Sequence, residues 1–324
     1  MWRDELFEGA EGSAGLRLEV QCEGVPDIRV EVAGQGRMVV TQSGCGTLLF
    51  GWWRPRWEGV DWARTQAACS YVSPVGPLSA ERARAIGDTD DPRALGRWAH
   101  LLAGRIHRSR GPLHTGTWSL TPEDWMTDRA GSTHSAEQWH DAVHTDHPSG
   151  FVDWRPTAAS RQVLPLRALS NPDTARVKAW RKLARENCLP PVLLWWISGL
   201  NCRVVLDGHD RIVAARAEGL TPHALILASA RPGHTEAIGA WAVSAYEDRM
   251  LRAQRRAADR DPFATLAISS AGQILAKELH EVASRPARTR AWQMPDGSAG
   301  WVHQADEQVP GWLSRVSAQR THEL

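Results

Sequence analysis

The sequence predicts a protein of the α+β class, and three features of its 324 residues lead to this prediction. Apolar and polar residues alternate near the start, as they do in half-buried strands. Strand and helix patterns then follow one another between residues 162 and 230. Helical patterns dominate after residue 233. We therefore expect a β-rich and then helical domain over residues 1–155, a small mixed sheet with helices over 156–232, and a helical region over 233–324.

The first of these segments begins with strands. Alternating apolar residues predict strands over residues 16–22, 28–32, 37–40 and 46–53. A helix is predicted to start at Asp91, an N-cap residue that precedes Pro92 in the first turn. Thr121 and Pro122 predict a second helix start on the same grounds. A polar stretch over 126–160, rich in His, Ser, Thr and Pro, indicates a boundary near residue 155.

The middle segment shows the most regular pattern. Strands are expected over residues 162–169, 190–197, 202–206 and 223–229, and helices over 171–187 and 210–218. The first helix has an apolar face, which consists of Val177, Trp180, Leu183 and Ala184. Gly219 follows the second helix at the position where a glycine commonly ends one.

The third segment is expected to contain an amphipathic helix over residues 236–260, a second helical stretch over 271–284 and a loop-rich tail. The far end of the first helix is basic, with arginines at positions 249, 252, 255, 256 and 260. A solvated helix face explains these arginines, and a surface that contacts DNA is the alternative.

Composition excludes several classes of protein. The net charge is only +1, so no overall field attracts the chain to nucleic acid or to anionic lipid. Five scattered cysteines without CxxC spacing indicate reduced thiols rather than a disulfide framework or a zinc site. The start, MWRDELFEGAEGS, has no apolar signal-peptide core, and no apolar run approaches the roughly 20 residues of a membrane span. We expect a cytoplasmic protein without a membrane partner.

The stretch RVVLDGHDRIVAARAEGL reads as a strand, a polar turn and a helix, and the turn is the main candidate site. Unpaired N–H groups and the dipole at a helix start favour anions, and Gly208 lets the backbone approach one closely. Arg211 supplies a fork for phosphate oxygens, and His209 adds a donor. Asp207 is a carboxylate beside this site, where a metal ion or an acceptor hydroxyl is expected. The alternative is an ordinary turn with Asp210 as the helix N-cap.

The stretch VVLDGHDRIVAARAEG resembles the signature of the ParB/sulfiredoxin superfamily, which carries an x-G-x-x-R turn between a strand and a helix. Upstream, LPLRALSNPDTAR is similar to the first ParB box, with Asn171, Pro172 and Arg176 at its Asn-Pro-x-x-x-Arg positions. The resemblance covers about residues 162–230. It implies a ParB/sulfiredoxin-like fold over 156–232 and a nucleotide site formed by Asn171, Arg176 and residues 208–211.

Within this superfamily the turn looks most like that of the free-serine kinases, D-G-H-H-R. ParB proteins have a G-E-R-R turn and bind CTP, and sulfiredoxin has a nucleophilic Cys where this chain has His209. The likeness implies an ATP- or ADP-dependent phosphotransferase for a small molecule such as an amino acid, with Asp207, Asp173 and His209 as its catalytic residues. Asp173 is also a candidate helix N-cap. The fold also fits a nucleotide-gated DNA-binding or regulatory protein and a scaffold without catalysis.

Asp210 is the departure from the kinase turn, since it replaces the second His. Its negative charge weakens anion binding unless a divalent cation intervenes. We therefore expect either that Mg²⁺ is required, with Asp207 as a ligand, or that the site no longer binds nucleotides. ATP or ADP is the expected nucleotide, and CTP is the alternative.

Two further groups of residues are weaker candidates. Trp52, Trp53 and Trp57 lie beside arginines and are interpreted either as core residues or as a surface that stacks a base. His140, His144 and His147 lie near two aspartates, and the first two have the i, i+4 spacing of paired metal ligands on a helix. The absence of an HExxH motif favours a polar surface over a metal site.

Overall fold

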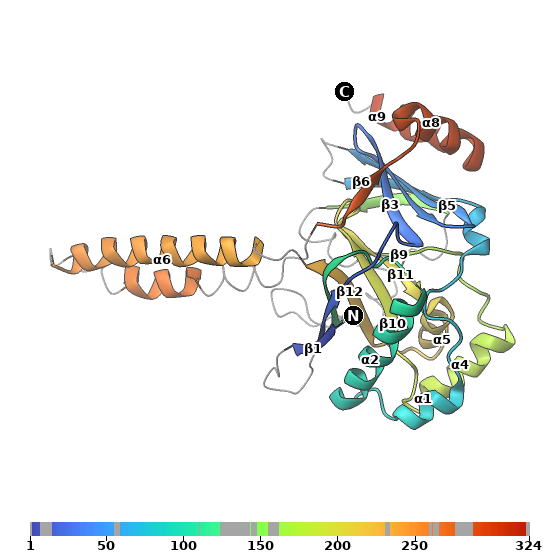
Figure 1. Ribbon diagram of the computed structural model, residues 1–324, viewed down its shortest axis with the longest axis horizontal. Coiled ribbons are helices and arrows are strands. Elements are labelled where there is room, and N and C mark those ends of the chain that lie inside the picture. The colour runs from blue at the N-terminus through green and yellow to red at the C-terminus, as the bar shows by residue number, and fades with distance from the viewer. Residues whose placement is uncertain are drawn as a thin grey trace. The chain divides into compact units, whose positions relative to one another are not determined.

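The structure is a computed structural model, and it describes residues 2–6, 15–54, 59–109, 111–123, 143, 148–154, 162–230, 234–258, 261, 266–275 and 288–321. The α+β class is confirmed, because the described residues form several helices and two sheets (Figure 1). The chain divides into two compact units. The main unit consists of Met1–Ser229 with Arg288–Leu324, and the helical unit of Ala230–Ala287.

The first sheet of the main unit has seven strands in the order β1-β2-β7-β12-β10-β11-β9. Their bounds are β1 (Trp2–Leu6), β2 (Gly15–Val20), β7 (Gly116–Glu123), β12 (Ala224–Ala230), β10 (Val192–Ile197), β11 (Cys202–Asp207) and β9 (Val163–Pro165). The sheet is mixed, since β10 is antiparallel to β11 and parallel to β12. All four strands expected between residues 162 and 230 are present. They share this sheet with three strands from the first 155 residues, so the sheet is larger than the small one expected for 156–232 alone.

The predicted helix start at Thr121 and Pro122 is wrong, because both residues belong to β7. Trp118 and Leu120 of this strand are fully buried. In the pairing of β2 with β7, Leu16 lies opposite Leu120, and Pro122 lies beyond this last pair, where its missing N–H costs no hydrogen bond to β2. Alternate burial in a sheet therefore outweighs a local helix-start signal.

Four helices of the main unit gather around the β10 and β11 end of the seven-stranded sheet (Figure 1). They are α1 (Ala80–Ile86), α2 (Pro92–Ser109), α4 (Ala175–Arg185) and α5 (His209–Ala217), and a 3₁₀ turn, η1 (Ala67–Ser70), precedes them. The helix predicted to start at Asp91 is confirmed as α2. The predicted inward face of α4 is also confirmed, since its four apolar residues are all buried.

The second sheet has six strands in the order β13-β3-β4-β5-β6-β8. Their bounds are β13 (Ala291–Gln293), β3 (Ile28–Gly34), β4 (Arg37–Gln42), β5 (Gly46–Arg54), β6 (Gly59–Arg64) and β8 (Ser149–Asp153). Its two faces serve different cores. Met38 and Val40 join the largest core, to which the seven-stranded sheet also contributes, whereas Val39 between them joins a smaller core with the C-terminal helices.

The loop-rich tail predicted for the C-terminus is wrong. The helices α8 (Gly297–Gln308) and α9 (Trp312–Thr321) lie beside the six-stranded sheet (Figure 1). Trp301 and Trp312 are almost completely buried and pack on Phe50 of β5, with ring centroids 5.5 and 6.2 Å from it. These helices depend on a partner that lies about 250 positions earlier in the chain, and burial of two large aromatic residues explains their stability.

The helical unit contains α6 (His234–Ala258) and a second helix over residues 266–275. The helix predicted over 236–260 is confirmed as far as Ala258, and residues 276–284 of the second predicted helix lie outside the described residues. Arg252, Arg255 and Arg256 are exposed, which a solvated face and a contact surface for DNA both require. None of the helices in the described part of the chain is both long enough and apolar enough to cross a membrane.

Candidate functional site

The turn between β11 and α5 is tightly specified by a glycine. Gly208 has a φ of +101°, in the left-handed region that side chains disfavour. A Cβ atom at this position would also lie 2.8 Å from Nη2 of Arg211. The carbonyl of Gly208 accepts the backbone N–H groups of Arg211 and Ile212, both at 2.9 Å, and so starts the helix. The backbone angle therefore favours glycine here, and any other residue would also push against the paired guanidinium of Arg211.

Asp207 and Arg211 form a buried ion pair across this turn. Nη2 of Arg211 donates to Oδ2 of Asp207 at 2.7 Å and to the carbonyl of Pro191 at 3.0 Å. Its guanidinium carbon lies 5.8 Å from the ring centroid of Trp180, a cation–π contact. The other oxygen of Asp207, Oδ1, accepts the hydroxyl of Ser73 at 2.6 Å. Each oxygen of this carboxylate thus has a partner.

Asp210 lies on the first turn of α5 and is neutralised by the protein itself. Its Oδ1 accepts hydrogen bonds from Arg167 and from the hydroxyl of Ser170, both at 2.7 Å. Its Oδ2 lies 3.0 Å from Nε of Arg176. Burial raises the pKa of the Asp210 carboxyl, but the hydrogen bonds from Ser170 and Arg167 and the charges of Arg167 and Arg176 outweigh burial and lower the pKa. The expected conflict between Asp210 and a bound anion is therefore reduced by arginines, without a divalent cation.

His209 is buried in the wall of the pocket and packs beside Tyr71, with ring centroids 5.6 Å apart. Burial, followed by the positive charges of Arg167, Arg64 and Arg211, lowers the pKa of His209 well below its usual range. The imidazole is therefore neutral near pH 7. A neutral imidazole has one donor nitrogen and one acceptor nitrogen. The sequence predicted His209 as a hydrogen-bond donor, and the structure indicates that this donor is uncharged.

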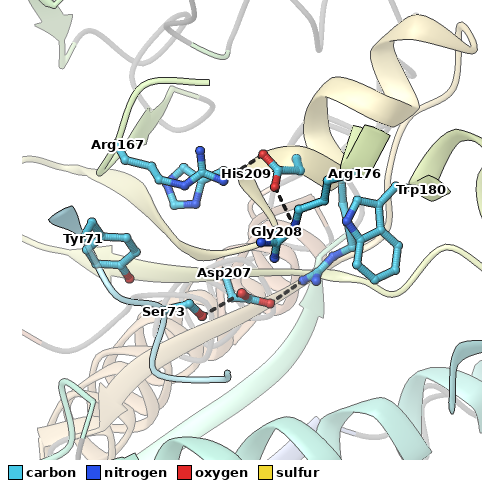
Figure 2. Close-up of a pocket in the computed structure, with 10 residues that line it drawn as sticks. Tyr71, Ser73, Arg167, Arg176, Trp180, Asp207, Gly208 and His209 are labelled. Carbon is cyan, nitrogen blue, oxygen red and sulfur yellow. Dashed lines mark hydrogen bonds and ion pairs between the residues drawn. The ribbon is translucent and has the colours of Figure 1, made fainter. Parts of the chain in front are cut away.

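These side chains line one polar pocket of about 130 Å³ (Figure 2). Figure 2 shows Ser73 and Tyr71 on one side of the turn and Arg176 and Trp180 on the other. The ten lining residues are Tyr71, Ser73, Arg167, Arg176, Trp180, Asp207, Gly208, His209, Asp210 and Arg211. Three arginines face two aspartates, so the pocket has a net positive charge.

The structure brings together most of the residues selected from the sequence, but it leaves two of them outside. Neither Asn171 nor Asp173 lines the pocket. The amide oxygen of Asn171 accepts the backbone N–H of Asp173 at 2.8 Å, and Asp173 forms an exposed ion pair with Lys178 at 3.4 Å. The N-cap prediction for Asp173 is wrong, because Thr174 caps α4 by accepting the N–H of Val177.

Four lining residues were not selected from the sequence as site residues. Trp180 was assigned to the core, and Arg167 sits within the first ParB-like box without being one of its named positions. Tyr71 and Ser73 precede the turn by more than 130 positions, so no local pattern could connect them with it. Tyr71 reaches the site through a hydrogen bond from its hydroxyl to the carbonyl of Leu206 at 2.7 Å.

The pocket does not form a metal cage of its own. Within the described ranges, no group of three or more His, Cys, Asp or Glu side chains is placed to hold a metal ion. Asp207 and Asp210 already pair with arginines. A Mg²⁺ ion at Asp207 would therefore have to arrive with substrate phosphates, which is the usual mode for this ion. The four cysteines with described side chains are all free thiols: Cys22, Cys45, Cys188 and Cys202.

The other candidates do not form a comparable site. Trp52 packs against Trp301 of α8, with ring centroids 6.0 Å apart, and so contributes to a core. Trp53 is 40% exposed and stacks on Trp154. Trp57 and the three histidines at positions 140, 144 and 147 lie outside the described residues.

Models of protein families, curated proteins and solved structures were compared with this chain, and none of them matches it. The function must therefore be inferred from the chemistry of the pocket.

Proposed function

We propose that this chain is a nucleotide-binding protein with a ParB/sulfiredoxin-like domain over residues 156–232, and that it transfers a phosphoryl group from ATP or ADP to a hydroxyl group. The acceptor class proposed from the sequence is a small molecule such as an amino acid. The order of elements supports the domain proposal: β9, α4, β10, β11, α5 and β12 follow the strand and helix order of the two ParB-like boxes.

One observation carries the proposal, namely buried side-chain nitrogen atoms without partners at the start of α5. Across the described part of the chain, neither Nε of Arg211 nor Nε2 of His209 has a hydrogen-bond partner. Both residues are 3% exposed and line the pocket. A buried polar atom without a partner costs free energy, and a phosphate oxygen is an acceptor that would remove this cost for Arg211. The helix dipole adds attraction for an anion at the same place.

The size of the pocket indicates which part of a nucleotide it would hold. Complete small-molecule sites usually enclose at least about 300 Å³. The pocket encloses about 130 Å³, which is room for a phosphate group and a few water molecules. We therefore expect the terminal phosphates inside the pocket and the base and sugar outside it.

The proposed chemistry assigns a role to each charged group. Phosphoryl transfer depends on positioning and on stabilising negative charge, which are the roles expected for Arg167, Arg176 and Arg211. Asp207 would accept a hydrogen bond from the acceptor hydroxyl and take up its proton. Neutral His209 would hold a phosphate oxygen or a bound water molecule.

Calorimetry with ATP, ADP, CTP and GTP, each with and without Mg²⁺, tests the binding proposal directly. The matched variants are Arg176→Gln and Arg185→Gln, two exposed arginines at opposite ends of α4. Arg176 lines the pocket, whereas Arg185 pairs with Glu218 outside it. We expect Arg176→Gln to weaken nucleotide binding roughly tenfold, the effect of losing one partly solvated charged contact, and Arg185→Gln to leave it unchanged. Binding heat that is absent for every nucleotide, or equal loss in both variants, would contradict the proposal.

A further inference from the structure

Ser73 occupies the place at Asp207 where the proposed reaction needs its acceptor. The hydroxyl of Ser73 donates to Oδ1 of Asp207 at 2.6 Å, while Oδ2 of the same carboxylate binds Arg211. Ser73 comes from the loop after η1, 134 positions before Asp207 in the chain, and it lines the pocket. Figure 2 shows its side chain pointing at the carboxylate.

This contact has the geometry of a hydroxyl next to its general base. A base must lie within about 2.6–3.2 Å of the oxygen whose proton it removes. An external alcohol would have to share an oxygen of Asp207 with Ser73 or Arg211, because each oxygen already accepts a hydrogen bond from one of them. Ser73 is already in place.

The loop holds the Ser73 hydroxyl in a defined position. Its Oγ also accepts the backbone N–H of Val75 at 3.2 Å. Two residues earlier, the buried hydroxyl of Tyr71 anchors the loop on the carbonyl of Leu206. An acceptor fixed in this way avoids the entropic cost of bringing two molecules together. Arginines 167, 176 and 211 line the same pocket and would face the transferred group.

We propose that Ser73 is a phosphoryl acceptor and that the chain phosphorylates its own Ser73 from a nucleoside triphosphate. This inference rests on the proposed function, because it uses the same pocket and the same phosphoryl donor. The Oγ–P bond forms as the bond between the γ-phosphorus and the β,γ-bridging oxygen breaks. The nucleoside diphosphate leaves with that electron pair, and the Ser73 proton passes to Asp207. The phosphoserine carries about −1.5 to −2 charge, which the pocket arginines offset.

If Ser73 has only a structural role, its hydrogen bonds tie the loop to the turn and it is not phosphorylated. The test incubates the full chain with γ-labelled ATP and Mg²⁺ and no added acceptor, and then maps the label by mass spectrometry. We expect one phosphoryl group on Ser73, at a rate independent of protein concentration because transfer is intramolecular. The label should survive hydroxylamine, which removes an acyl phosphate from an aspartate but not a serine ester.

Two serine variants provide the matched comparison. Ser73→Ala should abolish incorporation, because alanine has no hydroxyl to accept the phosphoryl group. Ser70→Ala changes an exposed serine at the end of η1, outside the pocket, and should leave incorporation unchanged. Mapping in the unmodified protein needs no variant, so the test does not depend on whether Ser73→Ala folds.

Calorimetry on the same preparation separates the two proposals. If a nucleotide binds or is turned over and Ser73 stays unlabelled, the acceptor assignment is wrong and the proposed function stands. Label that persists in Ser73→Ala would overturn the assignment in the same way. If neither a nucleoside triphosphate nor ADP binds, both proposals fail together.

Discussion

Two buried Arg–Asp pairs lie in the main unit, and their surroundings differ. Arg54 and Asp61 join β5 to β6 of the six-stranded sheet, with side chains 9% and 4% exposed. Arg211 and Asp207 join β11 to α5, with side chains 4% and 10% exposed. The two pairs are thus equally removed from solvent. Burial and ion pairing alone do not distinguish a structural pair from a pair at a site.

The hydrogen bonds around each arginine make the distinction. Arg54 donates to both oxygens of Asp61 and also to Gln319 of α9 at 3.0 Å. Its guanidinium group thus finds its hydrogen-bond acceptors within the protein. Arg211 contacts only one oxygen of Asp207, and its buried Nε has no partner among the described residues. A pocket adjoins Arg211, and Ser73 takes the second oxygen of Asp207. A buried N–H group that has no acceptor and lies beside a pocket is expected at a binding site.

The largest effect is expected from Asp61→Asn. Breaking a buried pair leaves Arg54 with an uncompensated charge, so the free energy of unfolding should fall by about 3–5 kcal/mol. The loss should be the same with and without nucleotide or phosphate, because Arg54 does not line the pocket. Urea unfolding followed by circular dichroism, with and without these ligands, measures both quantities. Recovery of stability on adding phosphate would show that the two pairs are not different in kind.

Asp207→Asn should give a smaller loss that a ligand can reverse. Arg211 donates one hydrogen bond to the carboxylate of Asp207, whereas Arg54 donates two to Asp61, so we expect a smaller loss of about 1.5–3 kcal/mol without ligand. Phosphate or nucleotide should restore part of this stability, because a bound anion now neutralises Arg211 and binding stabilises the native state. Phosphoryl transfer should be lost, since the amide cannot take up a proton. The same unfolding curves, with an assay of ADP release, test both statements.

If Asp61→Asn and Asp207→Asn respond to phosphate in the same way, the distinction between a structural pair and a pair at a binding site is wrong. If phosphate shifts neither unfolding curve, the unpartnered donors of the pocket do not bind anions. If ADP release in Asp207→Asn equals that of the unmodified protein, Asp207 has no part in the chemistry.

The pH dependence of stability provides a third comparison, because the site contains a buried histidine. Burial lowers the pKa of His209 well below its ordinary value of 6.5. Between these two values the unfolded chain binds a proton at His209 that the folded chain does not. The free energy of unfolding should therefore fall by roughly 1.4 kcal/mol for each pH unit below 6.5. Burial also lowers the pKa of His114, which adds to this dependence in the same direction.

The His209→Gln variant isolates the contribution of the site. It should flatten the loss of stability between pH 6.5 and the folded pKa of His209, while the contribution of His114 remains. Chemical unfolding at several pH values measures the difference. Identical slopes in the two proteins would show that His209 can be protonated in the folded state, and the pocket would then carry a further positive charge.

The sequence predicted the elements of the middle segment well because their signals are local. The turn at Gly208 requires a glycine for its own backbone angle, and the buried face of α4 appears as a period of three to four residues. The pocket was predicted only in part. Ser73 and Tyr71 reach it through tertiary contacts, and the helices around Trp301 and Trp312 depend on a distant sheet. Contacts between distant segments leave no periodic signal in either segment.

The smallest effect is expected from Asp173→Asn, and it tests whether the sequence or the structure identifies the site more accurately. The kinase-like reading of the sequence makes Asp173 catalytic. In the structure its side chain is 79% exposed, pairs only weakly with Lys178 and lies outside the residues that line the pocket. Exposed pairs of this kind contribute about 0–1 kcal/mol, so both stability and phosphoryl transfer should change little.

Thr174→Ala is the matched control for Asp173→Asn, because it removes the observed cap of α4 at the next position. It should cost about 0.5–2 kcal/mol of stability while leaving transfer largely intact. Unfolding curves and ADP release measured side by side distinguish the roles. A strong loss of transfer in Asp173→Asn with unchanged stability would make Asp173 catalytic after all. In that case the segment from Asn171 to Thr174 would have to move toward Asp207 when the nucleotide binds, and the pocket would be only part of the active site.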